Sequence, residues 1–210
     1  MSGTGSRVAK QRQVRIIGGQ WRGRKLTFTP AGGLRPTGDR IRETLFNWLA
    51  PYIQGARCVD LFAGSGALGL EALSRGAEHC DFVDTAGPAL AQINQHLRTL
   101  NAPDRGTCHA GTAQQFLQHT AIPYDIVFVD PPFTLQLATP VCASLASNRR
   151  LGDAALVYVE TAATDSSLDA PQQWTLHREK TAGGVTYRLF TSRQDETVSL
   201  SRRGALSLPD

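Results

Sequence analysis

Apolar residues along the chain follow two patterns. Short runs rich in apolar and β-forming residues predict strands at 58–62, 81–84, 107–110, 124–129 and 154–160. Helical spacing of apolar residues predicts helices at 39–50, from a glycine loop to about residue 75, and at 88–100, 112–118 and about 135–147. Because strands and helices alternate, the pattern predicts an α/β domain with a doubly wound, Rossmann-like and mostly parallel sheet.

Two further pairs of apolar runs flank double glycines, which favour hairpin turns. The runs 174–180 and 185–190 flank Gly183-Gly184 and predict an antiparallel C-terminal hairpin. The runs 14–17 and 21–28 flank Gly18-Gly19 and predict a small N-terminal β-hairpin. The expected organisation is a flexible N-terminus (1–13), a basic hairpin extension (14–36), the main α/β domain (37–192) and a polar tail (193–210).

Basic residues are concentrated at the start of the chain. Residues 1–42 carry ten basic side chains and one acidic side chain, for a net charge of +9, whereas the remainder carries −5. A basic segment on an acidic domain indicates a polyanionic partner such as a nucleic acid, whose phosphates the cations would contact. The ring of Trp21 could either stack on a base or pack inside the protein. The residues expected to contact nucleic acid are Arg15, Trp21, Arg22, Arg24, Lys25, Arg35, Arg40 and Arg42.

Composition narrows the class of protein further. No run approaches the ~18 apolar residues of a membrane span, and the N-terminus lacks the apolar core of a signal peptide. The four cysteines are far apart, as expected of free thiols in a reducing cytoplasm. The five histidines form no ligand pair, so no metal site is expected.

The stretch 59–69, Val-Asp-Leu-Phe-Ala-Gly-Ser-Gly-Ala-Leu-Gly, is typical of a strand, a glycine loop and a helix start. Glycine lets the backbone turn sharply near a ligand, and the first N–H groups of a helix can receive a carboxylate or phosphate. Asp84 ends the next strand, where an acid can accept ribose hydroxyls. Nicotinamide dinucleotides and S-adenosylmethionine both fit these features.

A second motif, Asp130-Pro131-Pro132-Phe133, follows the apolar run 124–129 and is expected at the same edge of the sheet. The two prolines fix the backbone and remove two N–H donors, which leaves carbonyl acceptors beside a carboxylate. Such a ledge suits an exocyclic amine, and Phe133 can stack on a flat base. A nicotinamide dehydrogenase has no use for this arrangement, so the motif favours S-adenosylmethionine.

Together these motifs resemble the class I S-adenosylmethionine-dependent methyltransferases that methylate amines. The blocks RIIGGQWRGRKL (15–26), LRPT (34–37) and RETLFNWL (42–49), with 176–180 and 187–189, are similar to the RsmD family. Members of that family methylate N2 of one guanine in bacterial 16S rRNA. The likeness spans about residues 14–190, and its N-terminal block is much more specific than the glycine loop.

The resemblance implies a class I methyltransferase sheet and a role for each motif. The residues implied to bind S-adenosylmethionine are Asp60, Ala63, Gly64, Ser65 and Gly66 for the methionine part, Asp84 for the ribose, and Gly111 and Thr112 near the adenine. The residues implied in catalysis are Asp130, Pro131, Pro132 and Phe133. Two positions depart from the family, because many relatives carry Glu at residue 84 and Asn or Asp near 110–112.

The implied function is methyl transfer to guanine N2 of 16S rRNA by a cytoplasmic monomer, with rRNA presented in a small-subunit particle that carries ribosomal proteins. Three alternatives stay open. The same motif serves adenine-N6 methylation of DNA, and its Asn form serves glutamine methylation of protein. A non-catalytic RNA-binding role in ribosome assembly is the alternative from another class.

Overall fold

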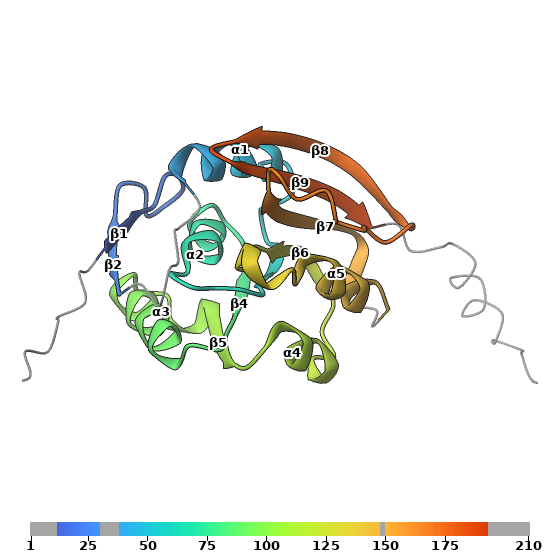
Figure 1. The fold of residues 1–210 in the computed structure, drawn as a ribbon. Helices are drawn as coiled ribbons and strands as arrows, with labels where there is room; N and C mark the ends of the chain where they lie inside the picture. The colour runs from blue at the N-terminus through green and yellow to red at the C-terminus, as the bar shows by residue number, and fades with distance from the viewer. Residues whose placement is uncertain (1–11, 30–37, 148–149, 193–210) are drawn as a thin grey trace, which may run out of the picture.

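The computed structural model describes residues 12–29, 38–147 and 150–192 of the 210-residue chain. Its central sheet has seven strands in the order β5-β4-β3-β6-β7-β9-β8 (Figure 1). Strands β3 to β7 are parallel, and β9 is antiparallel to β7 and β8. The strands are β3 (Arg57–Asp60), β4 (His79–Asp84), β5 (Gly106–Ala110), β6 (Tyr124–Val129), β7 (Leu151–Ala162), β8 (Trp174–Ala182) and β9 (Val185–Ser192). The predicted mixed sheet with an antiparallel C-terminal hairpin is confirmed.

Helices cover both faces of this sheet, which explains why its central strands are continuously apolar. The helices are α1 (Asp39–Leu49), α2 (Ala67–Ser74), α3 (Gly87–Thr99), α4 (Ala113–His119) and α5 (Ala138–Ser147), with short 3₁₀ turns at Pro103–Arg105 and Phe133–Leu135. Side chains of α1, α2 and α3 share one buried cluster with the sheet, for example Phe46 and Ile93. Leu117 of α4 and Val141 of α5 belong to the cluster on the opposite face. No helix in the described parts is long and apolar enough to span a bilayer.

The N-terminal hairpin forms a separate two-stranded sheet of β1 (Arg12–Arg15) and β2 (Lys25–Phe28). It lies beside α3 (Figure 1), where Thr27 O is 3.0 Å from His96 Nε2 and the Thr29 N–H donates to Gln92 Oε1 at 3.0 Å. The hairpin is therefore docked on the main domain.

Several predicted element boundaries differ from the structure, and two of these differences have a clear physical cause. The second strand of the hairpin was expected from residue 21 but begins at Lys25, because the preceding loop hydrogen-bonds to α2 and is closed by the Gly23 N–H on Ile16 O at 2.9 Å. The helix expected from about residue 135 begins at Ala138, because Gln136 adopts a left-handed conformation (φ +48°) and ends the preceding 3₁₀ turn.

Candidate functional site

Three acidic residues meet at the carboxyl edge of the parallel sheet. Asp60 ends β3, Asp84 ends β4 and Asp130 follows β6. Strand β3 pairs with both β4 and β6, so these strand ends are neighbours. Ligands of open α/β sheets bind at this edge, where the strand order reverses direction. The structure therefore brings the two predicted motifs together.

The glycine loop turns between β3 and α2 as the sequence predicted. Gly64 and Gly66 both have positive φ, at +49° and +77°, which side-chain-bearing residues rarely adopt. The Gly64 N–H donates to Asp84 Oδ2 at 2.7 Å, which joins the loop to the end of β4. At Gly69 a Cβ would lie 2.3 Å from the Phe82 ring, so the third glycine allows α2 to pack closely on the sheet.

Asp60 is buried and only partly satisfied. Its Oδ2 accepts the Gly69 N–H at 3.3 Å, whereas its Oδ1 is buried without a hydrogen-bond partner. Burial, together with the nearby charge of Asp130, raises the pKa of Asp60 to about 7. A cationic ligand group beside Oδ1 would supply the missing partner, as the ammonium of a methionine moiety does.

Asp84 is held firmly but keeps spare acceptor capacity. Its Oδ1 accepts the Ala86 N–H at 2.7 Å, and its Oδ2 accepts from Gly64. Because a carboxylate has about four lone-pair sites, two remain for hydroxyl donors such as those of a ribose. The first turn of α2 also has no side-chain cap, and its N–H groups other than that of Gly69 can receive the carboxylate of a ligand. Ala63 and Ser65 lie in the same loop.

The motif at 130–133 combines two prolines of different burial with an accessible ring. Pro131 is buried, whereas Pro132 is exposed and leads into the 3₁₀ turn that begins at Phe133. The Phe133 side chain is 39% exposed, so its ring is accessible to a flat base. Burial and the charges of Glu160 and Asp130 raise the pKa of Tyr158, which donates to Glu160 Oε1 at 2.5 Å.

The segment after β5 is fixed by local hydrogen bonds. Gly111 has φ +148°, and its N–H donates to Asp84 O at 3.0 Å. The Thr112 hydroxyl and N–H both donate to Gln115 Oε1, at 3.1 and 3.0 Å, in a capping box that starts α4. The donors of Thr112 are thus committed to Gln115, and its hydroxyl oxygen also accepts the Gln115 N–H at 3.2 Å. The Thr-x-x-Gln spacing was a readable signal for this cap.

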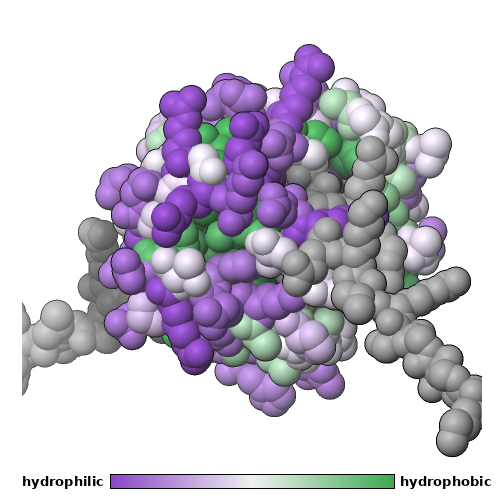
Figure 2. All heavy atoms as spheres, turned by 90° about the vertical axis from the view of Figure 1, so that its left-hand side faces the viewer, coloured by the Kyte–Doolittle hydropathy of each residue, from purple (hydrophilic) through white to green (hydrophobic). Residues whose placement is uncertain are grey.

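The basic side chains of the hairpin are divided between surface and interior. Those of Arg15, Arg22, Arg24, Lys25 and Arg40 are exposed. Figure 2 views the side of the molecule that carries the hairpin and α3, and hydrophilic side chains cover most of it. Arg35 lies outside the described residues.

Trp21 and Arg42, which the sequence analysis assigned to nucleic-acid contact, are both buried in the structure. Trp21 is 9% exposed, and its ring packs beneath the Arg105 guanidinium at 5.5 Å. Arg42 is 1% exposed and donates to Arg15 O at 2.9 Å and Asp39 Oδ1 at 2.7 Å. The helical pattern placed Arg42 off the apolar face of α1, but it faces an internal acid that the pattern could not show.

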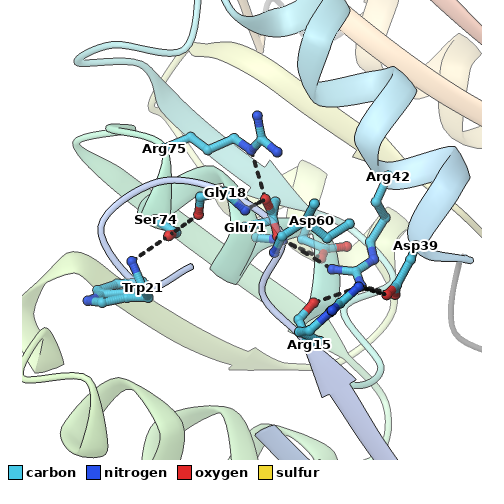
Figure 3. A network of polar contacts seen from close by, with 11 residues as sticks. Arg15, Gly18, Trp21, Asp39, Arg42, Asp60, Glu71, Ser74 and Arg75 are labelled. Carbon is cyan, nitrogen blue, oxygen red and sulfur yellow. Dashed lines mark hydrogen bonds and ion pairs between the residues drawn. The ribbon is translucent and has the colours of Figure 1, made fainter. Parts of the chain in front are cut away.

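That acid is Glu71 of α2, which the sequence interpretation missed (Figure 3). It is fully buried, and its carboxylate accepts the N–H groups of Ile17 and Gly18, both at 2.8 Å. The only available signal was a carboxylate within an apolar helix. The i,i+4 spacing of Glu71 and Arg75 points the other way, because this spacing is typical of an exposed ion pair on a helix surface.

Comparison with protein families gives a match over most of the chain. The family model described as "Conserved hypothetical protein 95" matches residues 14–191. The chain is 50% identical over 178 residues to "Ribosomal RNA small subunit methyltransferase D" of Escherichia coli K12, which covers 85% of this chain and 89% of that protein. It is 46% identical over 181 residues to the Haemophilus influenzae protein of the same name, covering 85% and 93%.

Solved structures agree with this match. The structure named "Putative methyltransferase yhhF from Escherichia coli" superposes with a TM-score of 0.79 at 46% identity, covering 87% of this chain and 99% of that one. A structure titled as the methyltransferase SMU.776 complexed with SAH has a TM-score of 0.68 at 14% identity and shares the fold, covering 89% and 57%.

Proposed function

The chain belongs to the RsmD family of S-adenosylmethionine-dependent methyltransferases, and on that premise we propose that it methylates the exocyclic N2 amine of a guanine in 16S rRNA. One observation carries this proposal. An acceptor ledge with an exposed ring, at 130–133, stands beside a buried carboxylate that lacks one partner, at Asp60. The ledge is suited to an amine on a flat base, and Asp60 to the cation of the cofactor.

The cofactor would be held by the carboxyl edge of β3 and β4. Asp60 Oδ1 would accept from its ammonium, the uncapped first turn of α2 would receive its carboxylate, and Asp84 would accept from its ribose hydroxyls. Residues 63–66 and 111–112 would line the rest of the bound cofactor. S-adenosylmethionine, when bound, supplies a methyl group activated by its sulfonium.

The base would be held by the motif at 130–133. The Asp130 carboxylate and the Pro131 carbonyl would accept the two hydrogens of the guanine amine, which turns the nitrogen lone pair out of the ring plane. Phe133 would clamp the face of the base, and Pro132 would fix the ledge. Catalysis then consists mainly of positioning and charge arrangement, and a paired base must first leave its stack.

The exposed cations of the hairpin would grip the rRNA backbone. Arg22, Arg24 and Lys25 are exposed within four consecutive positions, and Arg15 and Arg40 add to the same basic segment. A domain with net charge −5 after residue 42 would otherwise repel phosphates. The hairpin extension, about residues 14–36, therefore serves as the RNA-binding part and residues 37–192 as the catalytic part.

The substrate would be rRNA within a small-subunit particle that carries ribosomal proteins, and the enzyme would act in the cytoplasm as a monomer. The test incubates the protein and radiolabelled S-adenosylmethionine with small-subunit particles from cells lacking this modification, and maps the methylated base. We expect one labelled guanine, carrying the methyl on N2.

The same experiment separates the alternatives. Label in the adenine of DNA or in the glutamine of a protein would show that the enzyme methylates an amine group other than guanine N2. Tight particle binding with no methyl transfer would indicate a non-catalytic assembly factor. If naked 16S rRNA is labelled at the rate seen with particles, the proposal that the particle is the substrate is overturned, whereas the proposed methylation of guanine N2 stands.

A further inference from the structure

Helix α2 clamps the loop that joins the two strands of the hairpin. The buried Glu71 carboxylate accepts one N–H on each oxygen, from Ile17 on Oε2 and from Gly18 on Oε1. Its charge is balanced by Arg75, whose Nε donates at 2.7 Å, and by Arg42 at 3.5 Å. Figure 3 shows these groups converging on the carboxylate from three segments of the chain. Every oxygen of Glu71 is thus in use.

The next turn of α2 continues the clamp. Ser74 Oγ donates to Gly18 O at 2.6 Å and accepts the Trp21 N–H at 3.0 Å, and Ser74 O accepts the Gln20 N–H at 2.8 Å. The backbone approaches so closely that a Cβ at Gly19 would lie 1.9 Å from Ser74 O. A loop in this arrangement cannot swing freely away from the helix.

The clamp and the cofactor loop share one short rigid element. Helix α2 has eight residues and begins directly after Gly66 of the glycine loop. At about 1.5 Å per residue, Glu71 lies less than two turns from that loop. Helix α1 joins the same assembly, because Arg42 donates to Arg15 O at the end of β1. The basic hairpin is therefore fixed to the element that starts the active edge.

We propose that Glu71 is a positioning residue, which holds the basic hairpin at a fixed place so that gripped rRNA presents its base in register with Asp130. This proposal rests on the function proposed above. Glu71 touches neither cofactor nor RNA and acts through the backbone of Ile17 and Gly18. Its loss lets the hairpin shift while the cations that bind phosphate remain.

The first test is Glu71→Gln, because a glutamine keeps the shape but turns an N–H group toward a backbone N–H. We expect the single-turnover rate at saturating RNA and cofactor to fall about tenfold to a hundredfold, since small misplacements of reacting groups cost that much. The affinity for S-adenosylmethionine and the salt dependence of RNA binding should stay within about twofold. Glu179→Gln, which alters a half-exposed ion pair on β8, is the matched control and should leave all three unchanged.

Ser74→Ala is a milder variant for the case that Glu71→Gln does not fold. It removes one hydroxyl that joins Gly18 to Trp21, and we expect a fall in single-turnover rate of about threefold to tenfold. Ser147→Ala is its control, because that hydroxyl donates only within α5, to Ala143 O at 2.8 Å. Hydrogen exchange on the unaltered protein adds a measurement without mutation, in which the Ile17 and Gly18 amides should exchange as slowly as those of α2.

The outcomes are separable. Full single-turnover rates in folded Glu71→Gln or Ser74→Ala protein would overturn the proposal, and so would rapid exchange at Ile17 and Gly18. A parallel loss of cofactor affinity would also overturn it, because Glu71 would then act through the glycine loop. If wild-type protein methylates no guanine, the proposed function fails, whereas slow exchange at Ile17 and Gly18 would still stand as a property of the fold.

Discussion

Two buried carboxylates lie close together in the sequence, one at the carboxyl edge of the parallel sheet and one at the anchor of the hairpin. Glu71 has both oxygens bonded to backbone N–H groups and two arginines beside it. Asp60 has one oxygen bonded to a backbone N–H and the other without a partner, and burial raises its pKa to about 7. A fully paired buried carboxylate stabilises the fold, whereas one with an open oxygen is prepared for a ligand.

The largest expected effect is a difference in the free energy of unfolding between variants of these two acids. Removing the charge of Glu71 leaves Arg75 without this carboxylate and the buried Arg42 with Asp39 as its remaining anion, so Glu71→Gln should lower the free energy of unfolding by about 3–5 kcal/mol. Asp60→Asn removes a charge that burial disfavours, so it should not lower the free energy of unfolding at pH 8. Urea denaturation measures both, and equal losses would break the comparison.

The next effect concerns the reaction at the active edge. Asp130→Ala should lower turnover about 10²–10³-fold at saturating RNA, because the acceptor for the target amine is lost. Its affinity for S-adenosylmethionine should stay nearly intact. Asp153→Ala, at an exposed position on β7, is the control. Near wild-type turnover in Asp130→Ala would show that the ledge does not hold the amine.

Asp84→Ala should weaken cofactor binding without affecting the hairpin anchor. Loss of hydrogen bonds to a charged acceptor is worth about 1.5–3 kcal/mol, so calorimetry should show a dissociation constant roughly ten- to a hundredfold higher. Part of this loss comes from the glycine loop, since the Gly64 N–H would lose its acceptor. Unchanged cofactor affinity would contradict the ribose assignment.

The cations of the hairpin should act on RNA affinity alone. Replacing Arg22, Arg24 and Lys25 by Ala should lower the salt slope of RNA binding by roughly 2 to 3, because each phosphate contact contributes about 0.7–0.9. Arg178→Ala with Lys180→Ala, on β8 at the other end of the sheet, controls for the loss of two of these three positive charges. If both variants lower the slope equally, the RNA does not lie on the hairpin.

The smallest effect is a pH dependence at Asp60. Because the folded-state pKa is raised to about 7, the free protein should lose stability as the pH rises from the ordinary aspartate range through 7. Affinity for the cationic cofactor should rise over the same window, by at most tenfold per pH unit, because only the ionised carboxylate pairs with an ammonium. Asp60→Asn should flatten both profiles, and a wild-type affinity that does not vary between about pH 5.5 and 7.5 would contradict the pairing.

Periodicity and turn chemistry were enough to predict the fold. The continuous run at 124–129 and the glycine spacing at 64–69 determine a buried parallel strand and a strand–loop–helix unit from local residues alone. The two functional motifs could also be recognised, because each is a short contiguous segment at a strand end. The sequence thus determined the sheet and the position of Asp60, Asp84 and Asp130 at its carboxyl edge.

Only the tertiary structure decided which polar residues are internal. Arg42 and Glu71 are 29 positions apart and lie in two different helices, yet they meet inside the protein. Trp21 and Arg22 are neighbours, but one packs beneath Arg105 and the other faces solvent. Burial of a charge depends on partners supplied by distant segments, and no local pattern specifies which segments converge.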